Sequence, residues 1–394
     1  MKLPGKITLL ALAGLMLCAG CGSTTAPSAG AASARAAVPG PMSVAGSEAT
    51  NQATWAVLPM GAQSGPNQFW QLFLLAAGSR QWKLDTPPDI ATNGAPALAG
   101  LAGTDLVAGI RPSLYLDYSP ISLTADAGKT WSAGPPAAGL ASVPDALAGT
   151  PGGHQLLALS KSGEISTASV TGSGWRTLAT EHSLATSVAG RACGLTAVTA
   201  VAYATPASSS AAAVATPLVG GDCKKPGVAG IFARSGSSWR AAGPTLPAAL
   251  SGAPVRVLRL VASSAGTVAL WQSGTGAAAQ LMVGWRTGSG QWVLSPSFRL
   301  AGSGVVTAAF GAAGAAAVLL TDRKGATIEG PGSAWRQLPA VPAAPGATLA
   351  LPADSPVEAL TAAAGTLTVW QLAGTGAWAR AAIVKVPIQY GSSE

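Results

Sequence analysis

A tryptophan that follows a short turn containing glycine or serine recurs through most of the chain. The successive tryptophans are 49, 44, 64, 53 and 43 residues apart. Self-similarity at such a period indicates that one supersecondary unit is repeated along the chain. The turns with their tryptophans are Gly78–Trp82, Gly128–Trp131, Gly172–Trp175, Gly236–Trp239, Gly288–Trp292 and Gly332–Trp335.

Each unit contains short apolar runs bounded by Gly, Ser or Pro, which is typical of buried strands. A four-stranded unit of about 40–50 residues has the period of a β-propeller blade. We therefore expect an all-β fold over residues 41–394, a β-propeller of seven four-stranded blades, with six or eight as the alternatives. The runs of one unit are Val255–Ala262, Thr267–Gln272, Gln280–Trp285 and Trp292–Ser295.

The two ends of the repeat suggest how the ring closes. The last unit has apolar runs at Val357–Ala363, Thr366–Leu372 and Trp378–Ile388 and no evident fourth strand. We expect the N-terminal segment around Met42–Ala45 or Trp55 to complete this blade, because closure removes exposed strand edges. We expect each repeat tryptophan to open an outer strand and to pack over its turn or against the next blade.

One unit carries a sharper motif, Thr124-Ala125-Asp126-Ala127-Gly128-Lys129-Thr130-Trp131. It resembles the Asp-box of sialidase-like, BNR-type propellers, Ser/Thr-x-Asp-x-Gly-x-Thr-Trp. The resemblance is tight over these eight residues, and the other units keep only Gly-Ser and Trp. It implies a structural turn between the third and fourth strands of a blade, in which a carboxylate accepts backbone N–H groups. The structural residues would be Thr124, Asp126, Gly128, Thr130 and Trp131.

The N-terminus resembles a bacterial lipoprotein signal peptide. Lys2 and Lys6 precede the apolar run Ile7–Ala19, and the run ends in Leu17-Cys18-Ala19-Gly20-Cys21. This sequence is similar to a lipobox, with Cys18 where the family usually has Leu. The resemblance implies removal of residues 1–20 and lipidation of Cys21; an ordinary secretory signal is the alternative.

Residues 21–40 are rich in Ala, Gly, Ser and Pro and nearly uncharged, which is typical of a disordered tether. We therefore expect an exported protein, lipid-anchored on the outer face of the cytoplasmic membrane or in the cell envelope. Residues 21–394 hold 21 basic and 15 acidic side chains, scattered along the sequence. Scattered charge and an exported location both argue against nucleic-acid binding.

Cys193 and Cys223 are the two cysteines outside the signal. A pair in an exported domain predicts a disulfide, with two free thiols as the alternative. The longest tryptophan spacing falls in the same unit, where Ala204–Pro217 inserts a polar loop between two strands. We expect Cys193 to begin the first of these strands and Cys223 to end its antiparallel neighbour.

Residues with recognisable chemistry are few. His154 and His182 have no Cys, His or carboxylate at a ligand spacing, so we expect no metal and no cofactor. Ile110-Arg111-Pro112 has the wrong order for the Arg-Ile-Pro element of sialidases. Arg111, Tyr115, Asp117 and Tyr118 together form a candidate binding patch, the alternative being a solvated connection between strands.

These features favour a protein without catalytic residues, a binding or scaffolding module for an unknown protein partner or an envelope glycan. A glycoside hydrolase of sialidase-like architecture is the alternative, and an assembly factor for a membrane complex is a weaker one. Two carboxylates about 5–10 Å apart in the central channel would favour the hydrolase. An uncharged channel with a basic or aromatic rim would favour binding.

Overall fold

The computed structural model describes strands and turns of the predicted repeat region, all within the compact unit Gly40–Glu394. The described residues are 47–49, 53–60, 69–86, 97–101, 106–109, 121–133, 144–150, 153–171, 174–204, 215–263, 266–287, 290–342, 347–353, 355–363 and 365–386. The expected signal and tether, residues 1–40, lie outside them.

The described strands form successive antiparallel groups of four, and single residue pairs, Glu48 with Phe310 and Cys223 with Val255, link groups to one another. The first two groups are β1 (Ser47–Ala49), β2 (Ala53–Met60), β3 (Phe69–Ala76), β4 (Lys83–Leu84), and β5 (Ala97–Gly100), β6 (Leu106–Gly109), β7 (Ile121–Thr124), β8 (Ser132–Ala133). The next two are β9 (Ala146–Gly149), β10 (Gln155–Leu159), β11 (Glu164–Ser169), β12 (Arg176–Thr180), and β13 (Leu195–Ala204), β14 (Thr216–Cys223), β15 (Ile231–Ser235), β16 (Ser238–Ala241).

The remaining strands follow the same order. The fifth and sixth groups are β17 (Val255–Ser263), β18 (Gly266–Ser273), β19 (Gln280–Arg286), β20 (Trp292–Leu294), and β22 (Val305–Phe310), β23 (Ala316–Leu320), β24 (Gly325–Ile328), β25 (Arg336–Leu338). The seventh is β26 (Thr348–Ala350), β27 (Glu358–Ala363), β28 (Thr366–Leu372), β29 (Trp378–Lys385), and β21 (Phe298–Arg299) pairs with β19. The four runs predicted between 255 and 295 correspond to β17–β20.

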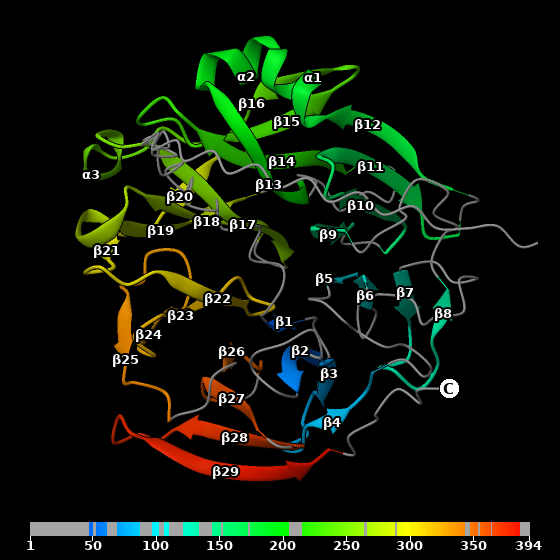
Figure 1. The fold of residues 1–394 in the computed structure, drawn as a ribbon, viewed down its shortest axis with the longest axis vertical. Helices are drawn as coiled ribbons and strands as arrows, with labels where there is room; N and C mark the ends of the chain where they lie inside the picture. Colours follow the sequence, from blue (N-terminus) through cyan, green and yellow to red (C-terminus); the bar gives the residue numbers. More distant parts are fainter. Residues whose placement is uncertain are drawn as a thin grey trace, which may run out of the picture. The chain divides into compact units, whose positions relative to one another are not determined.

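The groups follow one another around a common centre (Figure 1). The first strand of each group is the innermost, and contacts join β1 to β5, β5 to β9, β9 to β13, β13 to β17, β22 to β26 and β26 to β1. Between β17 and β22, Arg259 Nη1 donates to the Ala308 carbonyl at 3.1 Å. This cyclic order of four-stranded sheets is a β-propeller, so the predicted fold class is confirmed.

The expected closure of the last blade by an N-terminal segment is wrong. The seventh group takes all four strands from residues 348–385, and Trp55 lies in β2 of the first group. Met42–Ala45 lie outside the described residues. The missed strand, β26, has three residues and follows a Pro- and Ala-rich segment, so no apolar run announced it.

The repeat tryptophans stabilise the contacts between neighbouring groups. Each described hydrophobic cluster contains residues of two groups that are adjacent in the ring. Six of these seven clusters contain a repeat tryptophan, which comes from the group that follows in the cyclic order. The Trp292 indole N–H donates to the Ala242 carbonyl, just after β16 of the preceding group. The Trp335 indole N–H donates to the Pro296 carbonyl, two residues after β20 of the preceding group. The tryptophans therefore pack against the preceding blade, which corrects the expected contact with the next one.

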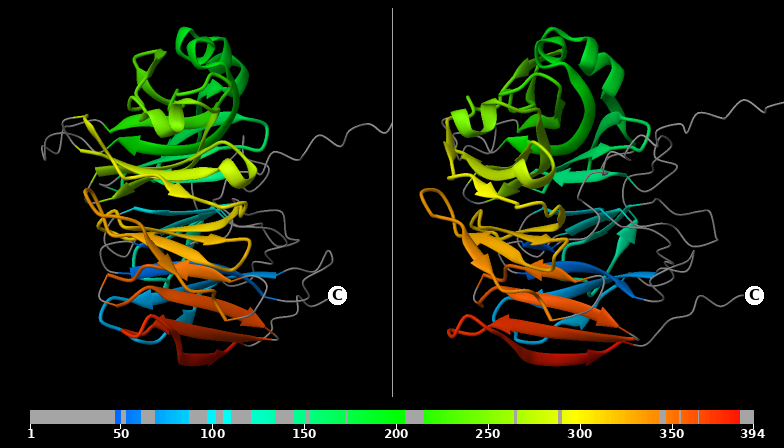
Figure 2. Two further views of the ribbon diagram at one scale, coloured as in Figure 1. Left: turned by 90° about the vertical axis from the view of Figure 1, so that its left-hand side faces the viewer. Right: turned by 60° about the vertical axis from the view of Figure 1, so that its left-hand side comes forward.

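Two helices, α1 (Glu181–Thr186) and α2 (Val188–Cys193), connect β12 to β13 and lie side by side (Figures 1 and 2). Thr180 and Ser183 form a capping box at the start of α1, and Ser187 caps α2. These helices account for part of the long tryptophan spacing. A third, α3 (Ala248–Ser251), precedes β17. None of the helices in the described part of the chain has the length and apolar character needed to cross a bilayer.

Candidate binding site

The inner strands β5, β9, β13 and β17 line a small pocket at the centre of the sheets. Most of its wall is built from glycine, alanine, leucine and valine. Thr199 and Arg259 contribute the polar side chains of this wall. The lining segments are 98–100, 146–149, 199–201 and 258–262.

Thr199 lies in a β-bulge, because the pairing of β13 with β14 shifts between Val198 and Ala200. A bulge leaves one residue unpaired and redirects its side chain. The Thr199 hydroxyl donates to the Val257 carbonyl at 2.5 Å, and the Gly220 carbonyl lies 3.4 Å from the same oxygen. Thr199 thereby links β13, β14 and β17 beside the pocket.

Arg259 is 7% exposed and follows a second bulge, between Val257 and Arg259 of β17. In addition to its bond to Ala308, its guanidinium lies over the Phe310 ring, 5.6 Å from the ring centroid. A guanidinium over an aromatic face is attracted by the ring quadrupole. The pocket wall therefore contains one buried cation that joins the fifth group to the sixth.

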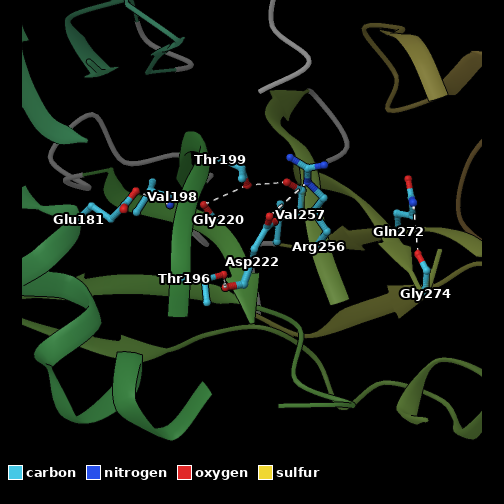
Figure 3. A network of polar contacts seen from close by, with 10 residues as sticks. All are labelled: Glu181, Thr196, Val198, Thr199, Gly220, Asp222, Arg256, Val257, Gln272 and Gly274. Atoms are coloured by element: carbon cyan, nitrogen blue, oxygen red, sulfur yellow. Dashed lines mark hydrogen bonds and ion pairs between the residues drawn. The ribbon is translucent and has the colours of Figure 1, made fainter. Parts of the chain in front are cut away.

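A polar network adjoins the pocket at the end of β14 and the start of β17 (Figure 3). Asp222 Oδ2 lies 3.3 Å from Arg256 Nε, and each side chain is 18% exposed. Burial raises the pKa of Asp222 to about 6, although Arg256 lowers it and Glu181 raises it slightly further. Glu181 accepts the Val198 backbone N–H at 2.9 Å. A carboxyl with this pKa changes its charge near neutral pH.

The disulfide prediction is confirmed. Cys193 and Cys223 are bonded, with their Cα atoms 5.3 Å apart, directly beside Asp222. Cys223 is the last residue of β14, as expected. Cys193 is the last residue of α2 and precedes β13, which corrects its expected place in that strand. The bond fastens the helical insertion to the sheet at the polar network.

The turn after β7 has the hydrogen bonds that a structural aspartate would make. Asp126 accepts the Thr130 backbone N–H at 2.9 Å and the Thr130 hydroxyl at 2.6 Å, and these bonds lower its pKa. The Thr124 hydroxyl accepts the Gly128 N–H at 2.8 Å, and Gly128 has φ +79°. The membership of this turn in the Asp-box class stays a prediction.

Asp85, in the connection that follows β4, packs against this turn. A Cβ atom on Gly128 would lie 1.7 Å from Asp85 Oδ2, so a larger residue would displace the Asp85 side chain. Burial raises the pKa of Asp85 to about 6, while the nearby Trp131 side chain lowers it. Trp131 also stacks edge-on against Trp55 at 6.0 Å. The turn therefore serves as a contact between the first two groups.

The other predicted site residues lie either outside the described part of the chain or on its exposed surface. Cys21 and the patch Arg111, Tyr115, Asp117 and Tyr118 lie outside the described residues. His154 lies in an exposed turn and His182 is exposed on α1. Across the described ranges no three His, Cys, Asp or Glu side chains gather as a metal site would require.

Sequence reasoning missed Arg259 and Glu358, although each is a charged residue inside an apolar strand run. Glu358 is 3% exposed and accepts the Trp82 indole N–H at 2.7 Å and the Gln371 amide at 2.8 Å. This contact joins the first group to the seventh. A charged side chain in a buried strand requires a partner. A charged residue within an apolar run of the sequence is therefore a signal that could have identified both residues.

No protein-family model and no curated protein sequence matches the chain. Among solved structures, the propeller domain of Myceliophteria thermophila Cps50 (Swd1) has a TM-score of 0.50 at 12% identity, over 87% of this chain and 97% of that one. The GH74 xyloglucanase from Xanthomonas campestris has a TM-score of 0.51 at 15% identity, over 84% of this chain and 52% of that one. YCF48 from Cyanidioschyzon merolae has a TM-score of 0.45 at 12% identity, over 87% and 95%. The likeness to the Cps50 domain and to the xyloglucanase shows the fold alone, a β-propeller.

Proposed function

We propose that the chain is an exported, lipid-anchored β-propeller that acts as a non-catalytic binding or scaffolding module for a protein partner or an envelope glycan. The composition of the central pocket is the observation that carries the proposal. Its described wall offers backbone, small apolar side chains, a hydroxyl and one guanidinium. Such a surface supplies contact area and hydrogen bonds without a pair of reacting groups.

The carboxylates near the sheets support the same proposal. A glycosidase needs two carboxyl groups about 5–10 Å apart and aimed at one bond. Asp126 is bonded within its own turn, Glu358 accepts two hydrogen bonds and Glu181 accepts a backbone N–H. These groups hold neighbouring segments together, which favours binding over hydrolysis.

Incubation with a panel of fluorogenic glycosides, sialosides included, tests this proposal against its rival. We expect no turnover above the buffer control. Turnover of a sialoside that a single carboxylate substitution abolishes would establish a hydrolase instead.

The location forms part of the proposal. A disulfide between Cys193 and Cys223 is typical of proteins that fold outside the cytosol. We propose that residues 1–20 are removed, that Cys21 carries the lipid and that residues 21–40 form the tether. Intact-mass measurement of membrane-extracted protein should show both changes, and a Cys21→Ser variant should leave the membrane fraction. Retention of that variant in the membrane would refute the anchor.

We also propose that Arg111, Tyr115, Asp117 and Tyr118, in the connection between β6 and β7, contribute to ligand contact. Arg111→Ala combined with Tyr115→Ala should weaken binding about thirtyfold, because a truncated hot spot costs about 2 kcal/mol. The exposed Arg380 in β29 supplies the control variant Arg380→Ala. Equal affinities of the two variants would remove the patch from the site.

A further inference from the structure

Four arginines lie on the third or fourth strands of three consecutive groups, and we call them the arginine stripe. They are Arg176 of β12, Arg234 of β15, Arg240 of β16 and Arg286 of β19. Arg234 pairs with Trp239, whereas Arg240 pairs with Ala233. Because side chains alternate between the faces of a sheet, Arg234 and Arg240 project from opposite faces of their hairpin.

Each face places its arginine beside one from a neighbouring group. Arg234 Nη1 donates to the Leu178 carbonyl of β12 at 2.8 Å, close to Arg176. Burial lowers the pKa of Arg234, and the positive charge of Arg176 lowers it further. Arg286 pairs with Trp292, and the Trp292 indole donates to the Ala242 carbonyl, two residues after Arg240. Burial lowers the pKa of Arg286, and the positive charge of Arg240 lowers it further. The stripe thus consists of two adjacent pairs of like charges.

The described acidic side chains form no ion pairs with these arginines. The Arg286 Nε atom is buried without a hydrogen-bond partner among the same residues. The Arg234 guanidinium lies over the Trp239 ring, 5.8 Å from its centroid, so it is held in place between two groups. Fixed, uncompensated guanidinium groups form a surface that is complementary to anions.

We propose that the arginine stripe binds a linear anionic polymer of the cell envelope, whose phosphate or carboxylate groups repeat along its chain. The inference rests on the proposed binding function and names a ligand class for it. A guanidinium matches both oxyanions through two parallel N–H bonds. The two arginine pairs are spread over three groups, so they can contact anionic groups that repeat along a polymer. Several weak contacts made at the same time increase the overall affinity.

The test uses the mature chain with poly(glycerol phosphate) and polygalacturonate as probes, followed by fluorescence anisotropy. We expect saturable binding to at least one polymer, and weaker binding as salt shortens the reach of the charges. Arg176→Gln with Arg240→Gln removes one exposed arginine from each pair and should lower the affinity about tenfold or more. Arg380→Gln with Lys385→Gln on β29 removes the same charge elsewhere and should stay within about twofold.

Several outcomes would overturn the proposal. An equal loss in the β29 control would show a general charge effect, provided that both variants keep the wild-type melting temperature. Binding to phosphatidylglycerol vesicles without binding to either polymer would assign the stripe to a lipid surface. If the protein binds neither polymer, the proposed role of the arginine stripe is refuted. The proposed binding function could then still hold with a different ligand. New reducing ends in bound polygalacturonate would instead refute the non-catalytic function and leave the stripe in place.

Discussion

Asp222 makes the stability of the fold depend on pH, because its side chain is buried. Burial beside the disulfide raises its pKa from the ordinary 3.8 to about 6 despite the nearby Arg256. The folded protein therefore holds a proton that the unfolded chain releases between these pH values. Linkage requires that this group stabilise the fold as the pH falls from about 6 towards 4, and that this stability be lost as the pH rises through about 6.

Asp222→Asn removes this titration and should change the pH dependence of unfolding. At pH 7 the variant should be at least as stable as the wild type, because it avoids a buried charge. Towards pH 4 its advantage should disappear. Urea unfolding at several pH values measures the difference in free energy of unfolding between the two proteins. Asp85 is present in both proteins, so its own titration cancels from this difference. A difference that is constant from pH 4 to pH 7 would contradict the raised pKa.

Gly220 permits the close approach of β14 to β17. A Cβ atom there would lie 2.6 Å from Val257 Cγ1 and 3.0 Å from Leu260 Cδ1. Gly220→Ala should therefore destabilise the protein by about 1–3 kcal/mol, the usual cost of overpacking a core. Gly374→Ala is the matched control, since a Cβ at Gly374 meets nothing within 4 Å. Equal melting temperatures of the two variants would show that the strands can separate without cost.

At the scale of elements, the repeat tryptophans join each sheet to the preceding one. Trp82 does so between the first and seventh groups through Glu358, whereas Trp335 donates to a backbone carbonyl. Hydrogen bonds to a charged group contribute more than neutral ones, about 1.5–3 against about 0.5–1.5 kcal/mol. The first and last groups are therefore joined by a contact of the stronger kind.

Trp82→Phe should cost more stability than Trp335→Phe, although both changes remove the same atoms. The first leaves the buried Glu358 with Gln371 as its described partner. Adding Glu358→Gln to Trp82→Phe should restore part of the loss, because it removes the buried charge. Chemical denaturation measures all three variants. A smaller loss for Trp82→Phe than for Trp335→Phe would contradict this role in closure.

The disulfide fastens the α1–α2 insertion to β14. The two cysteines are 30 residues apart, and a loop of that length corresponds to about 3–4 kcal/mol in the chain-entropy model. Replacing both cysteines by serine should lower the free energy of unfolding by about that amount. Reduction of the wild type should have a similar effect. Unchanged stability after complete reduction would refute this contribution.

At the scale of the whole molecule, the tryptophan period and the strand runs were sufficient to predict the propeller. The helical insertion was not predicted, because residues 181–193 form two short helices that depend on the caps of Thr180 and Ser187. The arginine stripe was not predicted either. Arg176 and Arg234 lie near each other where two sheets pack, but they are far apart in the sequence. The sequence alone therefore shows their charges as scattered. Contacts between blades are tertiary, and periodicity within a blade carries no information about them.

We propose that the propeller binds its ligand without converting it. The most direct test incubates the mature protein with purified cell-envelope glycan and measures both the bound fraction and the reducing ends of the recovered material. We expect saturable retention of glycan and no increase in reducing ends over the protein-free control. New reducing ends that disappear after substitution of a single carboxylate would contradict it and identify a glycoside hydrolase.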